Sequence, residues 1–350
     1  MADRNKRGKP GKVTKSPGKE EPQVDPKLKE WLQKNTYHYS DFSDISKLVK
    51  AKQKKDLKIS VVIPTLNEES TIGYEVELIR LEYMEAHGLV DEIIVVDSGS
   101  IDATVEIARD AGATVYYAAD ILPQYGTYLG KGENLWKSLY VAKGDIILWI
   151  DADIKNVSGR FIYGILGPLL LRDDVLYSKA FYQRPLHTPD GVLAAGGGRV
   201  TEILIRPLFN YFFKDLTGLF QPLSGEYAGY RTLLEKLPFS TGYGVETGLL
   251  IDIYENFGLD KIAQVDLNKR IHRNRPIEEL SKMAFQILKT FIRKCEDYGY
   301  LKVNKREDIK FFNRLISERE NYNILSEYID YIERPPMIEI KEYREKFSIK

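Results

Sequence analysis

Two aspartates that follow a short apolar run have a spacing that could do chemistry. Asp151 and Asp153 lie near the end of LWIDADI, which indicates a buried strand. If the strand continues through them, both carboxylates point to the same side. Carboxylates are costly to bury without a partner, and a hard cation such as Mg²⁺ accepts one or two of them beside phosphate oxygens and water. The segment alone fits a metal–diphosphate site and a strand that ends in an Asx turn equally well.

A second candidate site lies in AAGGGRVTEILIRPLFNYFF, where three glycines precede an expected helix. A glycine-rich turn at a helix N-terminus exposes backbone N–H groups to an anion. Arg199 adds a guanidinium suited to bidentate binding and Thr201 adds a hydroxyl, so a phosphate or carboxylate is well accommodated. The alternative is a flexible surface loop with a chance arginine, but the long apolar helix behind it favours a rigid turn.

Three further residues stand in contexts that suggest binding, each with a plainer alternative. Lys131 lies between two glycines in GKGENLW, which suggests close backbone approach, although it could be a surface lysine in a turn. Glu246 opens an expected apolar helix, where it either complements the helix dipole or hydrogen-bonds a ligand. His272 lies in the basic segment KRIHRNRP, where positive charge disfavours an imidazolium and leaves a neutral ring for a metal. A solvated basic turn is the alternative there.

The elements that must position these residues alternate between strands and helices. Expected strands cover 58–64, 91–97, 113–119 and 144–153, with expected helices over 69–88 and 101–112. This alternation predicts an α/β fold with a mostly parallel sheet covered on both faces. Ligands of such sheets bind beyond the carboxyl ends of the strands, so the polar segments 64–68, 97–100 and 151–153 are expected along one edge. The turn PTLNEEST lacks the glycine patterns of dinucleotide-binding and P-loop proteins.

Composition and charge limit the class of protein. The chain has 350 residues, of which 43% are apolar and 29% charged, as is typical of a soluble globular protein. Lys plus Arg and Asp plus Glu both total 51, so we expect no nucleic-acid and no membrane partner. Cys295 is the only cysteine, no apolar run approaches the ~20 residues of a membrane helix, and no signal peptide is apparent. We therefore expect a cytoplasmic protein.

The segments VVIPTLNEE, VDSGSIDAT, GKGENLW and WIDADI, in this order, resemble the nucleotide-sugar half of the GT-A glycosyltransferase fold. With SKAFYQRPL, GGGRVTE, QPLSGEYAG, GYGVETGLL and HRNRP, the chain from about residue 58 to 295 resembles the glucosyl-3-phosphoglycerate synthases, a family of retaining glycosyltransferases. One departure is Ala152, where close relatives are expected to have Ser. The resemblance implies a GT-A type fold whose mostly parallel central sheet is flanked by helices, plus a helical C-terminal region.

The resemblance also implies an activity and a set of ligands. Glucose would pass from UDP-glucose to the 2-hydroxyl of D-3-phosphoglycerate with retention, giving glucosyl-3-phosphoglycerate for synthesis of the compatible solute glucosylglycerate. A divalent metal would assist, with Mg²⁺ favoured and Mn²⁺ or Co²⁺ open. The residues implied in donor binding are Pro64, Thr65, Leu66, Asn67, Glu68, Ser98, Lys131, Asp151, Ala152, Tyr243, Gly244, Val245 and Glu246. Those implied in acceptor binding are Gly198, Arg199, Val200, Thr201 and Asn274. The implied metal ligands are Asp153 and His272, and the implied catalytic residues are Asp153, Glu246 and Lys131.

The expected organisation follows from these assignments. We predict a disordered basic tail over 1–25, a helical lead-in over 26–57, a nucleotide-sugar-binding half over 58–155, an acceptor-binding half over 156–290 and a helical C-terminal extension over 291–350. The extension has apolar faces to cover, which suggests a homodimer, although an intramolecular role is equally physical.

Other functions stay open. The nearest is the same chemistry with GDP-mannose, because base choice depends on the pocket shape around Thr65 and Ser98. A nucleotide-sugar-binding sensor without turnover would not need GGGRVTE. A sugar-phosphate nucleotidyltransferase would want a Gly- and Arg-rich loop where PTLNEES stands, and nothing in the sequence supports a lipid-phosphate acceptor.

Overall fold

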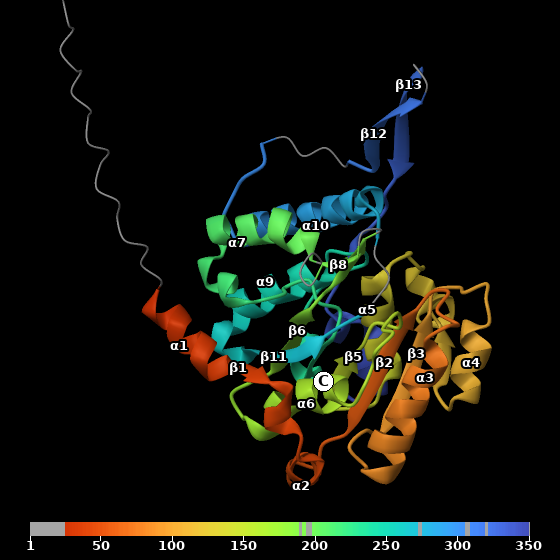
Figure 1. Cartoon of the computed structure of the whole chain (residues 1–350), viewed down its shortest axis with the longest axis vertical. Coiled ribbons are helices and arrows are strands. Elements are labelled where there is room, and N and C mark those ends of the chain that lie inside the picture. Colours follow the sequence, from red (N-terminus) through yellow and green to blue (C-terminus); the bar gives the residue numbers. More distant parts are fainter. Residues whose placement is uncertain are drawn as a thin grey trace, which may run out of the picture.

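An eight-stranded sheet forms the centre of the protein, which we describe from a computed structural model over residues 25–188, 191–193, 198–271, 275–304, 309–318 and 321–349. The strand order is β1-β11-β6-β9-β5-β2-β3-β4 (Figure 1). The strands are β1 Thr36–His38, β2 Ile59–Thr65, β3 Glu92–Asp97, β4 Thr114–Tyr117, β5 Ile146–Trp149, β6 Tyr177–Gln183, β9 Tyr227–Tyr230 and β11 Ile262–Lys269. Only β9 runs antiparallel to its neighbours, β5 and β6. The predicted mostly parallel α/β sheet is therefore confirmed.

Helices cover both faces of this sheet. On one face lie α2 Ile45–Lys54, α3 Ile72–Leu78 with its continuation Ile79–Ala86, α4 Thr104–Asp110 and α6 Arg160–Leu171. On the other lie α5 Lys131–Val141, α7 Arg206–Phe212, α8 Arg231–Leu234, α9 Val245–Phe257, α10 Ile277–Asp297 and α11 Lys341–Lys346. No helix in the described ranges is long and apolar enough to cross a membrane.

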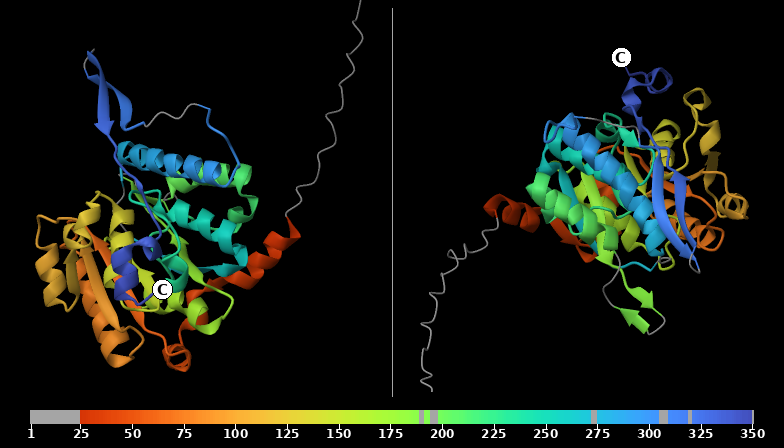
Figure 2. Two further views of the ribbon diagram at one scale, coloured as in Figure 1. Left: turned by 180° about the vertical axis from the view of Figure 1, so that it is seen from behind. Right: turned by 90° about the horizontal axis from the view of Figure 1, so that it is seen from above.

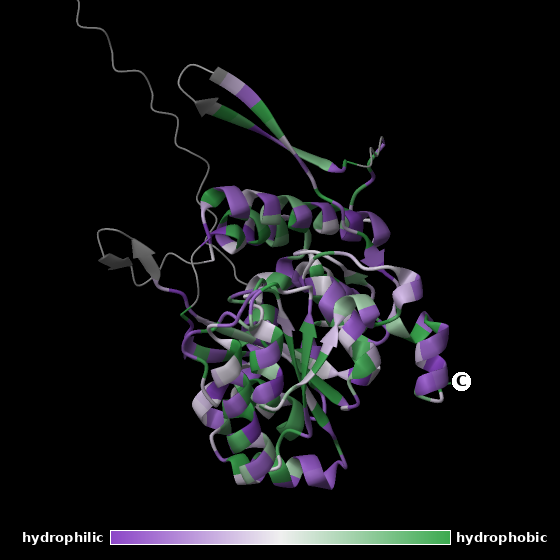
Figure 3. Cartoon of the chain, turned by 90° about the vertical axis from the view of Figure 1, so that its right-hand side faces the viewer, coloured by the Kyte–Doolittle hydropathy of each residue, from purple (hydrophilic) through white to green (hydrophobic). Residues whose placement is uncertain are grey.

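The two-sided cover explains why the strands are continuously apolar. Along β2, Val61 and Ile63 belong to the core shared with α3 and α6, whereas Val62 belongs to the core shared with α5 and α9. Successive strand side chains point to opposite faces, so each face needs its own apolar partner. In Figure 3 the central strands are accordingly hydrophobic, and the helices carry hydrophilic residues on their outer sides.

The lead-in over 26–57 contains α1 Pro26–Asn35 and α2, as predicted, but it also adds a strand. β1 pairs in parallel with β11 at the edge of the sheet. Trp31 of α1 is buried and donates its indole N–H to the carbonyls of Leu259 and Ile262, at 3.0 and 3.2 Å. The lead-in is thus part of the main fold.

The prediction of a helical extension over 291–350 is wrong for its central part. After α10 the chain forms a hairpin of β12 Phe311–Glu318 and β13 Asn321–Tyr328, which projects beyond α10 in Figures 1 and 2. FFNRLISE and NYNILSEY are rich in aromatic and β-branched residues, which favours strands over helices. Further on, β14 Glu333–Arg334 pairs with β10 Phe239–Ser240.

The division into a donor half and an acceptor half stays a prediction, but the two halves share one sheet. β6, β9 and β11 come from 156–290 and stand beside β5 and β2. The same region contains the short antiparallel pair β7 Leu186–Thr188 and β8 Gly191–Leu193. The predicted tail over 1–25 lies outside the described residues except for Asp25, the N-cap of α1.

Candidate active site

A cavity of about 440 Å³ opens at the carboxyl ends of β2, β3 and β5, a volume within the range of small-molecule sites. The expectation that the three polar segments meet at one edge of the sheet is confirmed. Of the residues predicted from sequence, the cavity is lined by Pro64, Leu66, Glu68, Ser98, Lys131, Asp151, Ala152, Asp153, Gly198, Arg199, Val200, Thr201, Tyr243 and Glu246. The structure thus brings donor-side and acceptor-side candidates together, and their individual roles stay predictions.

Thr65 and Asn67 do not line this cavity but connect the loops beside it. The Thr65 hydroxyl is buried and donates to Asp97 Oδ1 at 3.2 Å. Asn67 has a φ of 58° and donates its backbone N–H to Ser100 Oγ at 2.8 Å. Its side-chain oxygen accepts from the Ile101 N–H at 2.9 Å. Both residues therefore hold the loop after β2 against the loop after β3.

Gly244 and Val245 also lie outside the lining, and two predicted residues lie outside the described chain. A Cβ on Gly244 would stand 2.0 Å from Thr290 Oγ1 of α10, so this glycine allows two helices to approach. Val245 is buried at the start of α9. His272 and Asn274 fall in the gap between the described ranges, so their predicted metal and acceptor roles stay predictions.

Lys131 is the first residue of α5 and stands between two carboxylates. Its Nζ lies 2.5 Å from Asp151 Oδ1 and 3.0 Å from Glu246 Oε1. Burial alone would lower the pKa of Lys131, but attraction to the two carboxylates outweighs burial and raises it. The lysine is therefore a fixed cation rather than a proton donor near neutral pH.

The glycines around Lys131 permit close backbone contact, as expected, but the contact is internal. A Cβ on Gly132 would lie 1.8 Å from the Ser240 carbonyl oxygen. Gly130 has a φ of 140°, and a Cβ there would lie 2.6 Å from the Thr241 oxygen. The start of α5 is therefore packed directly on the segment that leads to Glu246.

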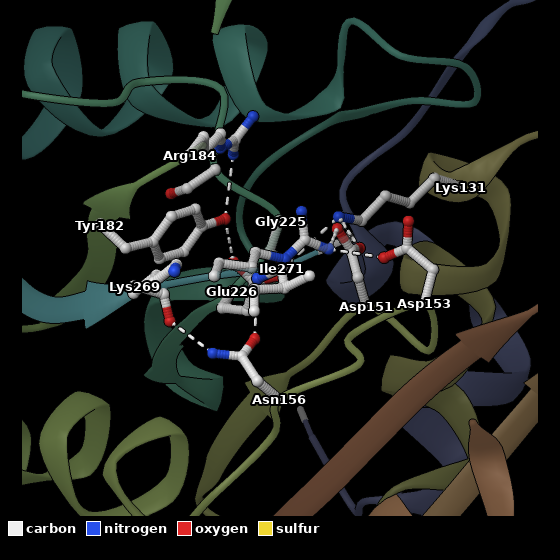
Figure 4. Close-up of polar contacts among 12 residues, drawn as sticks. Lys131, Asp151, Asp153, Asn156, Tyr182, Arg184, Gly225, Glu226, Lys269 and Ile271 are labelled. Carbon is white, nitrogen blue, oxygen red and sulfur yellow. Dashed lines mark hydrogen bonds and ion pairs between the residues drawn. The ribbon is translucent and has the colours of Figure 1, made fainter. Parts of the chain in front are cut away.

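The two aspartates face an arginine that the sequence analysis named only as part of a basic cluster. β5 ends at Trp149, so Asp151 and Asp153 lie in the following turn and not within the strand. Figure 4 shows the Lys131 ammonium joined to the Asp151 carboxylate, with Asp153 next to this pair. The buried Arg270 guanidinium lies 3.1 Å from Asp151 and 2.6 Å from Asp153.

The same guanidinium connects the aspartates to a third acidic residue. Arg270 Nε lies 3.1 Å from Oε1 of Glu226, which is fully buried in QPLSGEYAG. Burial would raise the pKa of Asp151, but Lys131 and Arg270 outweigh it and hold that pKa well below its usual value. The presence of Glu226 and Arg270 in the motifs QPLSGEYAG and KRIHRNRP is the only sequence signal that could have found this pair.

Glu68 has an unusual proton affinity for a cavity carboxyl. Burial, followed by repulsion from Asp153, raises its pKa to about 7. Nearby positive charge from Arg275 opposes the shift but does not cancel it. Glu68 therefore changes charge near neutral pH.

Arginines line another part of the cavity. Arg199 donates to the Arg275 carbonyl at 2.7 Å, and Arg275 donates to the Tyr243 hydroxyl at 3.1 Å. Arg184, which the sequence analysis did not single out, donates to the Tyr182 hydroxyl at 2.9 Å and also lines the cavity. A site with carboxylates and guanidinium groups suits an anionic ligand that arrives with a metal cation.

The donor atoms of this site fit a divalent metal. No group of three His, Cys, Asp or Glu side chains suited to a metal occurs in the part of the chain that the structure describes. The carboxylates of Asp151 and Asp153 nevertheless offer the oxygen ligands that Mg²⁺ prefers when phosphate oxygens complete its shell. A metal at this site would have to compete with Arg270 for both carboxylates.

Comparisons of sequence show the family of the chain. Residues 60–174 match the model of glycosyl transferase family 2. The glucosyl-3-phosphoglycerate synthase of Petrotoga mobilis is 52% identical over 92% of this chain and 98% of its own length. The protein of the same name from Mycolicibacterium smegmatis is 49% identical over 68% of this chain and 77% of its own.

Solved structures give the same result for the fold. Mannosyl-3-phosphoglycerate synthase from Rubrobacter xylanophilus aligns with a TM-score of 0.81 and 35% identity, over 89% of this chain and 97% of that one. Glucosyl-3-phosphoglycerate synthase from Mycobacterium tuberculosis, in complex with Mn²⁺, UDP and phosphoglyceric acid, aligns with a TM-score of 0.75 and 39% identity, over 87% and 97%. The family resemblance and the fold class predicted from the sequence are confirmed.

Proposed function

Since the chain belongs to the glucosyl-3-phosphoglycerate synthases, a family of glycosyltransferases, we propose that it transfers glucose from UDP-glucose to D-3-phosphoglycerate. Glucose is attached to the 2-hydroxyl with retention, and the product begins glucosylglycerate synthesis. One observation carries the proposal: a single cavity is lined both by the carboxylates after β5 and by Gly198 with the helical residues 199–201 that follow it. That arrangement supports a donor diphosphate and an anionic acceptor side by side.

A divalent metal, Mg²⁺ or Mn²⁺ with Co²⁺ open, belongs to this proposal. The Mycobacterium tuberculosis enzyme has been crystallised with UDP and either Mn²⁺ or Mg²⁺. Asp153 and His272 would hold the metal, with Asp151 nearer the ribose. When bound, the metal neutralises negative charge that develops on the departing diphosphate.

Lys131 and Glu246 act at the donor sugar in this proposal. Lys131 remains a cation because Asp151 and Glu246 lie within 3.0 Å of its ammonium group, so it attracts the phosphates of the donor. Glu246, from the first turn of α9, accepts hydrogen bonds from the sugar hydroxyls. The loop residues 64–68 and Ser98 surround the uracil and ribose.

The acceptor is held by its charges. Gly198 through Thr201 and Asn274 bind the phosphate and carboxylate of D-3-phosphoglycerate, with Arg199 giving a bidentate contact. The acceptor hydroxyl attacks the front face of the sugar, and its proton passes to the departing phosphate oxygen. Glu246 is no nucleophile in this scheme, so trapping a glycosyl adduct on Glu246 would overturn it.

A mass-spectrometric competition assay tests the proposal. The protein is mixed with Mg²⁺, 3-phosphoglycerate, and UDP-glucose and GDP-mannose together. We expect a hexosyl-phosphoglycerate and UDP, without GDP. Release of GDP would favour the second candidate, a mannosyl transfer, for which the alignment with the Rubrobacter xylanophilus enzyme is the specific support. No release of either nucleotide would mean a binding protein without turnover or a different acceptor.

A homodimer is also part of the proposal. The β12–β13 hairpin carries apolar side chains on one face, since Phe311 pairs with Tyr328 and Leu315 with Ile324. Leu315 is 86% exposed and Ile324 is 68% exposed. An exposed apolar face on a projecting hairpin is typical of a protein–protein contact, and a second copy of the chain would cover it.

We propose a cytoplasmic location on the basis of cysteine use. Cys295 is the only cysteine in the sequence, and it is buried in α10. Disulfides are rare in reducing compartments, so a chain with one buried thiol needs no oxidising environment to fold.

A further inference from the structure

The C-terminal segment of residues 332–335, which we name the strap, lies against the elements that carry the candidate catalytic residues. Its strand β14 pairs with β10, with Arg334 opposite Phe239 and Glu333 opposite Ser240. Just beyond β10, the Thr241 N–H donates to the Ile332 carbonyl at 2.9 Å. The strap therefore adjoins the segment that leads into Tyr243 and Glu246, although the family resemblance seen in the sequence ended near residue 295.

Arg334 extends from the strap to the start of α5. Its guanidinium makes a bidentate pair with Glu133, at 2.8 and 2.7 Å, and both side chains are buried. It also donates to the carbonyls of Tyr125 and Gly126, at 2.8 and 3.1 Å. Every one of these partners lies within six residues of Lys131, in the loop before it or in the first turn of α5.

Glu133 connects Arg334 to the residues around Lys131 and to the segment before Glu246. It is two residues after Lys131, and its backbone N–H donates to the Thr241 carbonyl at 3.0 Å. Its carboxylate also lies 3.4 Å from Lys137, which in turn donates to the Gly126 carbonyl at 3.0 Å. The loop, the first turn of α5 and the segment before Glu246 are thus joined through one buried charge network.

The strap itself is fixed from its other side. Glu333 lies 2.8 Å from the buried Lys294 of α10, which also pairs with Asp252 of α9 at 2.7 Å. The bidentate pair of Arg334 with Glu133 is directional, and the pair of Glu333 with Lys294 adds a second charged contact, so the strap is held on two sides. Arg334 does not line the cavity, and it acts only through the residues it holds.

We propose that Arg334 is a positioning residue that, through Glu133, sets the ammonium of Lys131 between Asp151 and Glu246. The strap is then part of the donor site, although it touches no substrate. This inference rests on the role given to Lys131 in the proposed function.

A double-mutant cycle tests whether Arg334 acts through Lys131. Arg334→Met, Lys131→Met and the double variant are compared for kcat/KM with UDP-glucose. A displacement of about 1 Å at a catalytic group can cost about 10²-fold in rate, so we expect a loss of that order for Arg334→Met. In the double variant we expect kcat/KM to fall only as far as it falls in Lys131→Met alone, because the effects of residues that act as one unit are not additive. Losses that multiply would overturn the proposal.

Arg231 provides a matched control. It is likewise buried and donates to carbonyls of Leu139, Ala142 and Gly144 at the far end of α5. Arg231→Met should lower the melting temperature, and its effect on kcat/KM should multiply with that of Lys131→Met. If both arginine variants behave alike in the cycle, Arg334 has no specific link to Lys131.

A second variant and a second measurement keep the test decisive if Arg334→Met does not fold or if turnover cannot be measured. Arg334→Lys keeps the buried charge but cannot form the bidentate pair, and it replaces Arg334→Met if that chain does not fold. The same cycle is measured on the affinity for UDP, which needs neither acceptor nor turnover. A wild-type protein inactive with 3-phosphoglycerate would contradict the proposed function, whereas additive losses in UDP affinity would contradict only the role of Arg334.

Discussion

Each of the two aspartates at the carboxyl end of β5 has a cationic partner. Asp151 is shared by Lys131 and Arg270, and Asp153 pairs with Arg270. Buried carboxylates need such partners, so the fold supplies two fixed cations beside the atoms assigned to a metal. A divalent cation at this site would compete with Arg270 for both carboxylates, while Glu226 remains as a partner of that guanidinium.

Asp153→Asn tests the metal assignment. Asp153 is the proposed direct ligand, so we expect kcat with Mg²⁺ to fall by at least about 10²-fold. Arg270 retains Asp151 and Glu226 as partners, so the protein should still fold. Mn²⁺ affinity measured by calorimetry in the presence of UDP should fall in parallel. Normal turnover and normal Mn²⁺ binding in this variant would show that Asp153 holds no metal.

Glu68 predicts a pH dependence of metal binding. Its pKa is raised to about 7, so the carboxyl is protonated below that pH and ionised above it. A cation near Asp153 favours the ionised form, so metal binding releases a proton below pH 7, and affinity rises with pH up to that value. Calorimetry in buffers of different ionisation enthalpy measures the protons released at pH 6.

We expect wild type to release about one proton more than Glu68→Gln at that pH. Glu69→Gln, a change at the neighbouring exposed carboxyl, should match wild type. Equal proton release from wild type and Glu68→Gln would contradict the titration of Glu68.

At the scale of elements, the contact between α5 and β10 positions Lys131 relative to Glu246. Gly132→Ala should break it, because the new Cβ would meet the Ser240 carbonyl oxygen at 1.8 Å. We expect the free energy of unfolding to fall by more than about 1 kcal/mol, with a loss of activity. Gly248→Ala in α9 is the control, since its Cβ would lie an ordinary 3.4 Å from Thr290 Cγ2. Denaturant unfolding measures the stability of both variants. If Gly132→Ala is as stable as Gly248→Ala, the contact between α5 and β10 is contradicted.

The strands and turns that could be predicted from the sequence are those marked by a run of apolar or polar residues within one short segment. The apolar strand of residues 58–64 and the polar turn after it identified one edge of the sheet, because a parallel sheet brings such ends together. The sequence did not reveal the hairpin over 311–328, because FFNRLISE has its apolar residues in adjacent pairs and lacks the alternation of a half-buried strand. The predicted helical extension therefore included this segment. Arg270 and Arg334 were not assigned roles, because their partners are far away in the sequence and only the tertiary fold brings them together.

At the scale of the whole molecule, the exposed hairpin predicts a dimer. Leu315→Glu places a charge in the middle of its apolar face, and we expect this variant to become a monomer by light scattering after size exclusion. Asn323→Glu, on the opposite face of the same hairpin, should leave the dimer intact. A wild-type protein that is already monomeric at micromolar concentration would contradict the dimer, and an unchanged mass for Leu315→Glu would place the contact elsewhere.

The account as a whole depends on one reaction. Carbon-13 NMR with UDP-glucose labelled at C1, 3-phosphoglycerate and Mg²⁺ follows that carbon directly. We expect the label to move to a single α-linked glucoside on the 2-hydroxyl of phosphoglycerate, at the rate at which UDP appears. A β-linked product, free glucose without a glycoside, or unchanged UDP-glucose would contradict the proposed transfer.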